Sequence, residues 1–123
     1  MSGSFFRLTG GLNKMINIEK YDDVYLISIR SDMTKENVKQ FEDVFDTILE
    51  KNVNKVIIDF EKVNFIVSQV LGIIIIKTKR LRETGGDIRI VNTNPYIARL
   101  LSIIGIGKII DTFEKKEDAL KDF

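Results

Sequence analysis

The chain has 123 residues, and its 19 basic and 18 acidic side chains give a formal net charge of +1. This length suits one domain with one hydrophobic core, and the near-neutral charge gives no reason to expect a nucleic acid or an anionic membrane as partner. The sequence contains neither cysteine nor histidine, which excludes disulfides, thiolate chemistry, a histidine phosphorelay and the commonest metal ligands. No nucleophile with a base beside it can be identified, so we expect no catalytic residue, metal or cofactor.

The first 14 residues differ from the rest because glycine and serine interrupt them and their hydrophobic periodicity is weak. We interpret residues 1–14 either as an N-terminal extension, native or added for expression, or as a part of the fold. The apolar pair Phe5-Phe6 favours the second interpretation, because such a pair in a tail often docks. The domain itself is predicted over residues 15–123.

The first half of this domain shows strand, helix and strand patterns in turn. Alternating apolar residues predict two strands over residues 16–18 and 24–29, joined by a turn at residues 21–23. Thr34 is then expected to cap an amphipathic helix, whose buried face is formed by Val38, Phe41, Phe45 and Ile48. Residues 55–60 form a short β-branched run that is typical of a central strand.

The segment that follows has conflicting signals. Four consecutive isoleucines at residues 73–76 favour a strand by propensity, yet the apolar segment is too long for an ordinary strand. Lysines and arginines gather at its end, and Gly85-Gly86 follows, as expected at the end of a helix. We therefore predict a helix over residues 69–83, with its first half almost wholly buried.

The remaining residues continue the alternation. A strand is predicted over residues 88–91, and Asn94-Pro95 predicts the start of a helix that ends at Gly105. Ile109 and Ile110 suggest a last short strand, and residues 115–120 a last short helix. The order predicts an α/β fold with a mixed, mostly parallel sheet of about four to five strands and helices packed against it.

One hydroxyl group, that of Ser68, lies between a predicted strand and a predicted helix in the most apolar part of the chain. A serine at this point can simply cap the helix. It can also be a phosphate acceptor, because a phosphate there would lie at unpaired N–H groups and at the positive end of the helix dipole. The phosphate would add nearly two negative charges to a surface formed by Phe65, Ile66, Val67 and Val70. The residue types alone leave both interpretations open.

The segment from Phe65 to Gly72 resembles the motif of STAS domains, the module of anti-sigma factor antagonists. That motif reads roughly aspartate-serine-x-glycine-leucine-glycine after a strand and an aromatic residue. Ser68 aligns with the phosphorylated serine of the family, and Leu71 and Gly72 match the motif. Three further regions agree with the family pattern. They are Ser31-Asp32-Met33-Thr34 with the downstream Asn37, a strand with Gly86, Ile88 and Val91, and a C-terminal pattern formed by Leu101, Gly105, Lys108, Ile109, Phe113, Ala119 and Leu120.

The resemblance implies a cytoplasmic bacterial regulator of transcription that is not an enzyme. Such a protein binds an anti-sigma factor of the serine-kinase type, is phosphorylated by it at Ser68, and is reset by a phosphatase. Partner contacts are expected at two loops that should end at one edge of the sheet. The expected contact residues are Asp32, Met33, Thr34, Asn37, Val67, Ser68, Gln69, Val70 and Leu71.

The chain also departs from the family motif. Val67 stands where the family has an aspartate before the serine, and Val70 replaces a small glycine. In the first loop, Ser31 and Thr34 replace a glycine and an aspartate. These departures leave an alternative, a STAS module without a phosphorylation switch that acts as a structural or ligand-sensing subunit of a regulatory complex.

Overall fold

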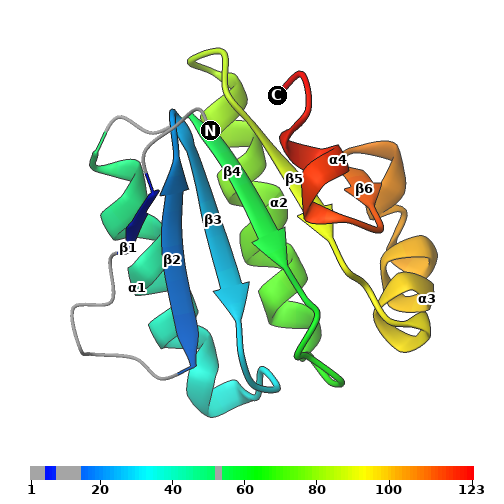
Figure 1. Ribbon diagram of the computed structural model, residues 1–123. Coiled ribbons are helices and arrows are strands. Elements are labelled where there is room, and N and C mark those ends of the chain that lie inside the picture. The colour runs from blue at the N-terminus through cyan, green and yellow to red at the C-terminus, as the bar shows by residue number, and fades with distance from the viewer. Residues whose placement is uncertain (1–4, 8–14, 52–53) are drawn as a thin grey trace.

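The computed structural model describes residues 5–7, 15–51 and 54–123, with side chains from residue 15 onward. Its centre is a six-stranded sheet in the order β1-β2-β3-β4-β5-β6 (Figure 1). The strands are β1 (Phe5–Arg7), β2 (Ile16–Tyr21), β3 (Val24–Ile29), β4 (Lys55–Asp59), β5 (Asp87–Val91) and β6 (Asp111–Phe113). The helices are α1 (Lys35–Leu49), α2 (Ser68–Arg82), α3 (Pro95–Ile104) and α4 (Lys116–Leu120), with a short 3₁₀ helix at Ile106–Lys108.

The sheet is mixed, which confirms the predicted α/β class. Strands β1, β2 and β3 pair antiparallel, whereas β3, β4, β5 and β6 pair parallel. The helices α1 and α2 cover one face of the sheet, and α4 lies on the other face near β5 and β6 (Figure 1). The main core lies under α1 and α2, and a smaller core of Val24, Leu26, Ile57, Val91 and Ala119 lies under α4.

The second helix contains all four consecutive isoleucines, as the cations and glycines at its end predicted. Gly85 adopts a left-handed conformation with a φ of 84°, and the Gly86 N–H donates to the Leu81 carbonyl, which ends the helix. The third helix spans Pro95–Ile104, with the same bounds as predicted, and Gly105 ends it with a φ of 83°. Local capping residues therefore set the lengths of both helices.

Within the predicted domain of residues 15–123, the sheet has five strands, β2 to β6, as predicted. A sixth strand, Phe5–Arg7, lies in the 1–14 segment and pairs with β2. The other residues of the 1–14 segment lie outside the described residues. The prediction of the last strand at Ile109 and Ile110 was wrong, because that strand is Asp111–Phe113 and includes neither residue. The N–H groups of these two isoleucines donate to the Ile106 carbonyl and complete a helical turn, so they are not available to the sheet.

An ion pair fixes α2 against α1. The Lys77 side chain is buried, and its Nζ lies 2.6 Å from Asp46 Oδ1 and 3.9 Å from Glu42 Oε2. A buried ammonium group has to be paired, so this contact joins the middle of α2 to α1. The buried apolar residues of α2 face the main core.

Among the described residues, no helix is both long enough and apolar enough to cross a bilayer. Within the same residues, no cluster of three or more acidic side chains is placed to hold a metal ion.

Candidate functional site

The candidate site is built from two loops that leave neighbouring parallel strands. We call residues 30–34, between β3 and α1, the Asp32 loop, and residues 60–67, between β4 and α2, the serine loop. Asp32 Oδ1 accepts hydrogen bonds from the backbone N–H groups of Asn64 at 2.7 Å and Phe65 at 3.1 Å. The carboxylate of one loop therefore fixes the backbone of the other.

Backbone pairing joins the same loops further along. Met33 forms an isolated parallel bridge with Ile66. The Met33 N–H donates to the Phe65 carbonyl at 2.9 Å, and the Val67 N–H donates to the Met33 carbonyl at 3.0 Å. The structure thus brings together the two regions in which partner contacts are expected, and it holds them as one surface immediately before Ser68.

The Asp32 loop is also tied to the start of α1. Asn37 Nδ2 donates to the Asp32 carbonyl at 3.0 Å, and the Asn37 N–H donates to the Thr34 carbonyl at 3.0 Å. Thr34 occupies the N-cap position as predicted, although its side chain makes no capping bond to the helix. The pKa of the Glu36 carboxyl lies below its usual value, because its own backbone N–H and then the Thr34 hydroxyl stabilise the charged form.

Ser68 lies at the start of α2, as expected, but the N-cap position belongs to Val67. The Ser68 side chain is exposed, makes no capping bond and has no hydrogen-bond partner among the described residues. Its interpretation as a capping side chain is therefore wrong. Of the four α-helices in the described part of the chain, α2 alone has neither a capping side-chain bond nor an acidic residue in its first turn.

Three of the residues expected at the contact surface are buried. Met33 and Val70 are 0% exposed, Leu71 is 1% exposed, and all three belong to the main core. The first turn of α2 directs these valine and leucine side chains toward the sheet, so they support the site from below and cannot touch a partner in this conformation. The surface that remains consists of Asp32, Thr34, Asn37, Val67, Ser68 and Gln69.

An aromatic pair that the sequence analysis did not identify lies beside this surface. The rings of Phe65 and Tyr96 stack with their centroids 6.5 Å apart and their planes at 19°. Asn94 also joins the serine loop to α3. Its Nδ2 donates to the Val63 carbonyl of the loop at 2.5 Å, and its Oδ1 accepts from the Ile97 N–H of the helix at 2.8 Å. The start of α3 is therefore attached to the serine loop; Asn94 indicated the start of this helix in the sequence, but not its contact with the loop.

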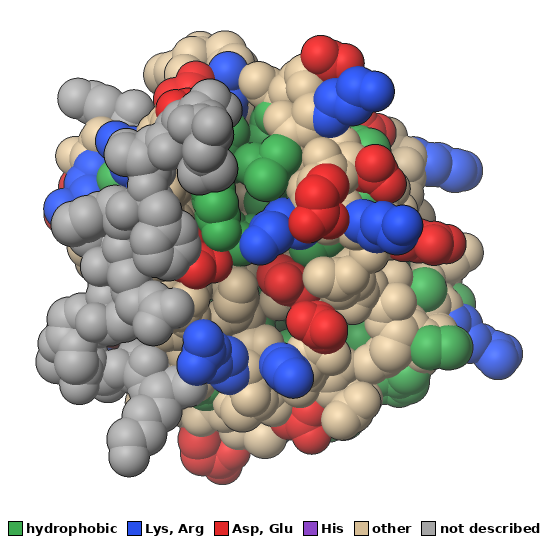
Figure 2. Space-filling view, viewed as in Figure 1, with side chains coloured by type: hydrophobic (Ala, Val, Ile, Leu, Met, Phe, Trp, Pro, Cys, Tyr) green, Lys and Arg blue, Asp and Glu red, His purple; other side chains and the backbone are tan. Residues whose placement is uncertain are grey.

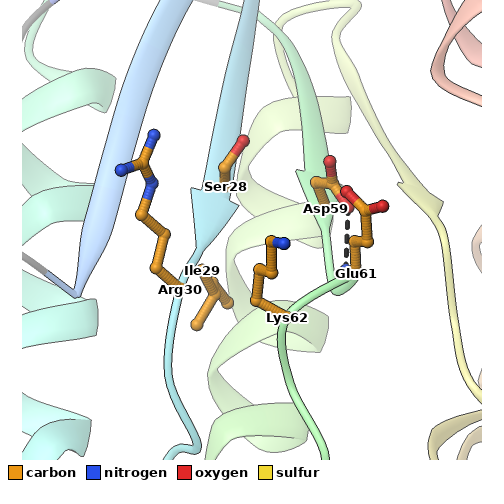
Figure 3. A pocket seen from close by; sticks show the side chains of 6 residues that line it. All are labelled: Ser28, Ile29, Arg30, Asp59, Glu61 and Lys62. Carbon is orange, nitrogen blue, oxygen red and sulfur yellow. Dashed lines mark hydrogen bonds between the residues drawn. The ribbon is translucent and has the colours of Figure 1, made fainter.

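An open hollow of about 390 Å³ lies at the ends of β3 and β4, where the Asp32 loop and the serine loop begin. Its walls are formed by Ser28, Ile29, Arg30, Asp59, Glu61 and Lys62 (Figure 3). Asp59 Oδ1 accepts from the Glu61 N–H at 2.9 Å and from Asn92 Nδ2 at 3.0 Å, so this carboxylate orders the loops around it. The charged side chains of the hollow form no ion pair with one another.

Comparison with known proteins identifies the family. The family model of the STAS domain matches residues 15–119, and the chain belongs to the STAS domain family. This confirms the resemblance that the serine motif and the C-terminal pattern suggested.

Individual relatives agree with this assignment. The chain is 29% identical over 102 residues to a Thermotoga neapolitana protein described as a candidate anti-sigma factor antagonist, and the match covers 82% of this chain and 90% of that protein. It also resembles the crystal structure of a Thermotoga maritima protein described in the same way, with a TM-score of 0.83, 27% identity, and coverage of 89% of this chain and 94% of the other.

A more distant structure shares the fold. It is the Bacillus cell fate determinant SpoIIAA in its phosphorylated form, with a TM-score of 0.64, 16% identity, and coverage of 95% of this chain and 96% of that one.

Proposed function

We propose that this chain is an anti-sigma factor antagonist that is switched by phosphorylation at Ser68. In its unphosphorylated form it binds an anti-sigma factor of the serine-kinase type and thereby frees a sigma factor. The partner kinase then phosphorylates Ser68, the complex dissociates, and a phosphatase restores the binding form. The chain acts as ligand and substrate in this cycle, not as an enzyme.

The observation that carries the proposal is the state of the Ser68 hydroxyl. It is exposed, it has no hydrogen-bond partner among the described residues, and it stands on the first residue of a helix whose first turn holds no carboxylate. Its oxygen can therefore attack the γ-phosphorus of ATP, with release of ADP and loss of the hydroxyl proton to a base of the kinase. The phosphate would accept from N–H groups of the first turn of α2 and would gain from the helix dipole.

The same location explains why the phosphate would release the partner. Partner contact at this edge would cover Val67 and Phe65, which are both partly exposed. A phosphate adds nearly two negative charges that must lose water when a partner covers them. Binding is weakened unless the partner supplies cations at the same point.

Intact mass after incubation with Mg²⁺, ATP and the cognate serine-kinase anti-sigma factor tests the modification. We expect a gain of one phosphate in the wild-type chain and none in Ser68→Ala. Titration calorimetry of the unmodified protein, the phosphorylated protein and Ser68→Asp against the same partner then tests the switch. We expect the phosphoprotein to bind most weakly and Ser68→Asp, with one charge and a shorter reach, to show a partial loss.

Val67 favours a second candidate, a STAS module without the phosphorylation switch. The family aspartate before the serine is absent, and the valine in its place packs partly against the main core. A kinase that needs this carboxylate would not recognise Ser68. No gain in mass under conditions in which the kinase is active would reject the switch and support this structural or ligand-sensing role.

A further inference from the structure

Exposed hydrophobic side chains gather in one part of the molecule. Among the described residues, the large exposed hydrophobic side chains are Phe65, Ile76, Tyr96, Ile103 and Ile104. All except Ile76 lie on α3 or stack against it, because Phe65 packs on Tyr96. Figure 2 shows hydrophobic side chains grouped at the lower right, over α3. We call Phe65 and the outward residues of α3 the α3 face.

Helical spacing places the outward residues of α3 side by side. Tyr96, Arg99 and Ile103 are three and four residues apart, so they follow one another along one side of the helix. Ile97 and Leu101 occupy the opposite side and are buried in the main core. The α3 helix therefore has a second apolar side that its own core does not use.

We infer that the α3 face is an interaction surface, and that the partner covering Ser68 also covers it. This inference rests on the proposed function, because it extends the surface around Ser68 along α3. The connection between the two parts is physical. The stacked rings and the hydrogen bond from Asn94 to the Val63 carbonyl join the serine loop to the first turn of α3. A partner that contacts Val67 and Ser68 would reach Phe65 next, and Tyr96 with it.

Charge defines the chemistry of this partner surface. Arg99 is the only charged residue in α3, it is exposed, and it forms no ion pair with the described residues. A guanidinium group covered by an apolar surface needs a carboxylate opposite it. We therefore expect the partner to present an apolar patch that contains at least one aspartate or glutamate placed to pair with Arg99.

The position of Arg99 argues against a second copy of this chain as the occupant. In a two-fold symmetric dimer formed through α3, the two α3 helices lie antiparallel across the axis. A residue at the middle of one helix then lies next to the same residue of the other copy. Arg99 lies at the middle of Pro95–Ile104, so the two Arg99 side chains would lie near each other across the dimer axis. Like charges at the centre of an interface oppose association. A different protein that offers a carboxylate does not face this penalty.

Titration calorimetry of the cognate serine-kinase anti-sigma factor against variants of this chain tests the inference. We expect Ile103→Glu to lower the affinity by about ten-fold or more, because it places a charge in an apolar contact. Arg99→Glu should have a comparable effect by repelling the partner carboxylate, and Arg99→Lys should retain most of the binding. The matched control is Ile76→Glu on α2, where an isoleucine is 62% exposed against 72% for Ile103, and it should bind like the wild type.

The other outcomes separate this inference from the switch. Normal binding by Ile103→Glu together with weak binding by Ser68→Asp would overturn the α3 face alone. Weak binding by Ile103→Glu together with normal binding by Ser68→Asp would overturn the switch and leave the α3 face in place, whereas no binding by the wild type would overturn both.

Two further results would identify a different occupant of the α3 face. A wild-type dimer that Ile103→Glu dissociates in sedimentation would make a second copy the occupant. Cosedimentation with phosphatidylglycerol vesicles that Arg99→Glu abolishes would assign the face to a membrane. Each of these last two results would also overturn the inference.

Discussion

The helices α2 and α3 begin at the same edge of the sheet, but their first turns are built differently. The side chain of Asn94 caps α3 through the Ile97 N–H and also reaches the Val63 carbonyl. At the start of α2, the corresponding position holds Val67, and the neighbouring Ser68 hydroxyl is exposed without a bond. A side chain caps the start of α3, whereas no side chain caps the start of α2, where the Val70 N–H donates to the Val67 carbonyl. The side chain at the start of α3 is used for stability, whereas the hydroxyl at the start of α2 remains exposed.

The sharpest test of this contrast is a charge placed two residues beyond Ser68. Val70 is fully buried on the side of α2 that packs into the main core, so we expect Val70→Asp to lower the free energy of unfolding by about 4 kcal/mol or more, which could prevent folding. Gln69→Asp is the matched control, because Gln69 is exposed in the same turn and an acidic residue there gains slightly from the helix dipole. Urea unfolding followed by circular dichroism measures both. Equal stability of the two variants would mean that Val70 is a surface residue.

The second test removes the cap of α3. Asn94→Ala loses the acceptor for the Ile97 N–H and the donor to the Val63 carbonyl, so we expect a loss of about 2 kcal/mol in stability. Asn94→Asp keeps the acceptor and should lose only about half as much. Both values come from the same urea titration. An unchanged stability in Asn94→Ala would remove the contrast between the two helix starts.

The third test concerns the carboxylate that joins the two loops. Asp32→Ala leaves the N–H groups of Asn64 and Phe65 without their acceptor, and we expect a loss of about 1 kcal/mol because the site is exposed to water. Asp32→Asn retains a neutral acceptor and should lose less. Hydrogen exchange gives a local readout, since the Asn64 and Phe65 amides should exchange faster in Asp32→Ala than in the wild type. Unchanged protection of these two amides would show that Asp32 does not hold the serine loop.

The smallest expected effect is that of Ser68→Ala on stability. Because the Ser68 side chain makes no capping bond, its removal should change the free energy of unfolding by no more than about 0.3 kcal/mol. Thermal unfolding of Ser68→Ala and Asn94→Ala under the same conditions compares the two losses of stability directly. A loss near that of a true cap, about 1 kcal/mol, would show that the hydroxyl caps α2 in solution and is less accessible to a kinase.

Local signals in the sequence predicted those parts of the fold that local chemistry determines. Asn94, Pro95 and Gly105 gave the bounds of α3, and the cations with Gly85 identified α2 despite its four isoleucines. The apolar pair Phe5-Phe6 indicated that the N-terminal segment docks, but its pairing with β2 was not predicted, because so short a strand carries no alternating pattern of its own. The last strand was misplaced because two of its three residues, Asp111 and Thr112, are polar and the two isoleucines before it complete a helical turn.

The sequence correctly predicted that the two loops of the candidate site lie side by side, but it placed some buried side chains at the surface. The parallel order of the strands was enough to place the Asp32 loop beside the serine loop. Residues 70–76 of α2 are all apolar or glycine, so periodicity could not separate the inward side from the outward side there, and Val70 and Leu71 were placed at the surface. The stack of Phe65 on Tyr96 joins residues 31 positions apart, and no sequence pattern reports such a contact.

The hydrogen bonds that the Asp32 carboxylate accepts also have a consequence for folding during synthesis. They connect residues that are 32 and 33 positions apart in the chain. Closing so long a loop is entropically unfavourable until β3 and β4 have paired and α1 has packed against them. On a ribosome, a chain that has not completed this crossover lacks the joined pair of loops. If the proposed partner binds both loops, it would therefore bind folded molecules and leave nascent or misfolded ones unbound.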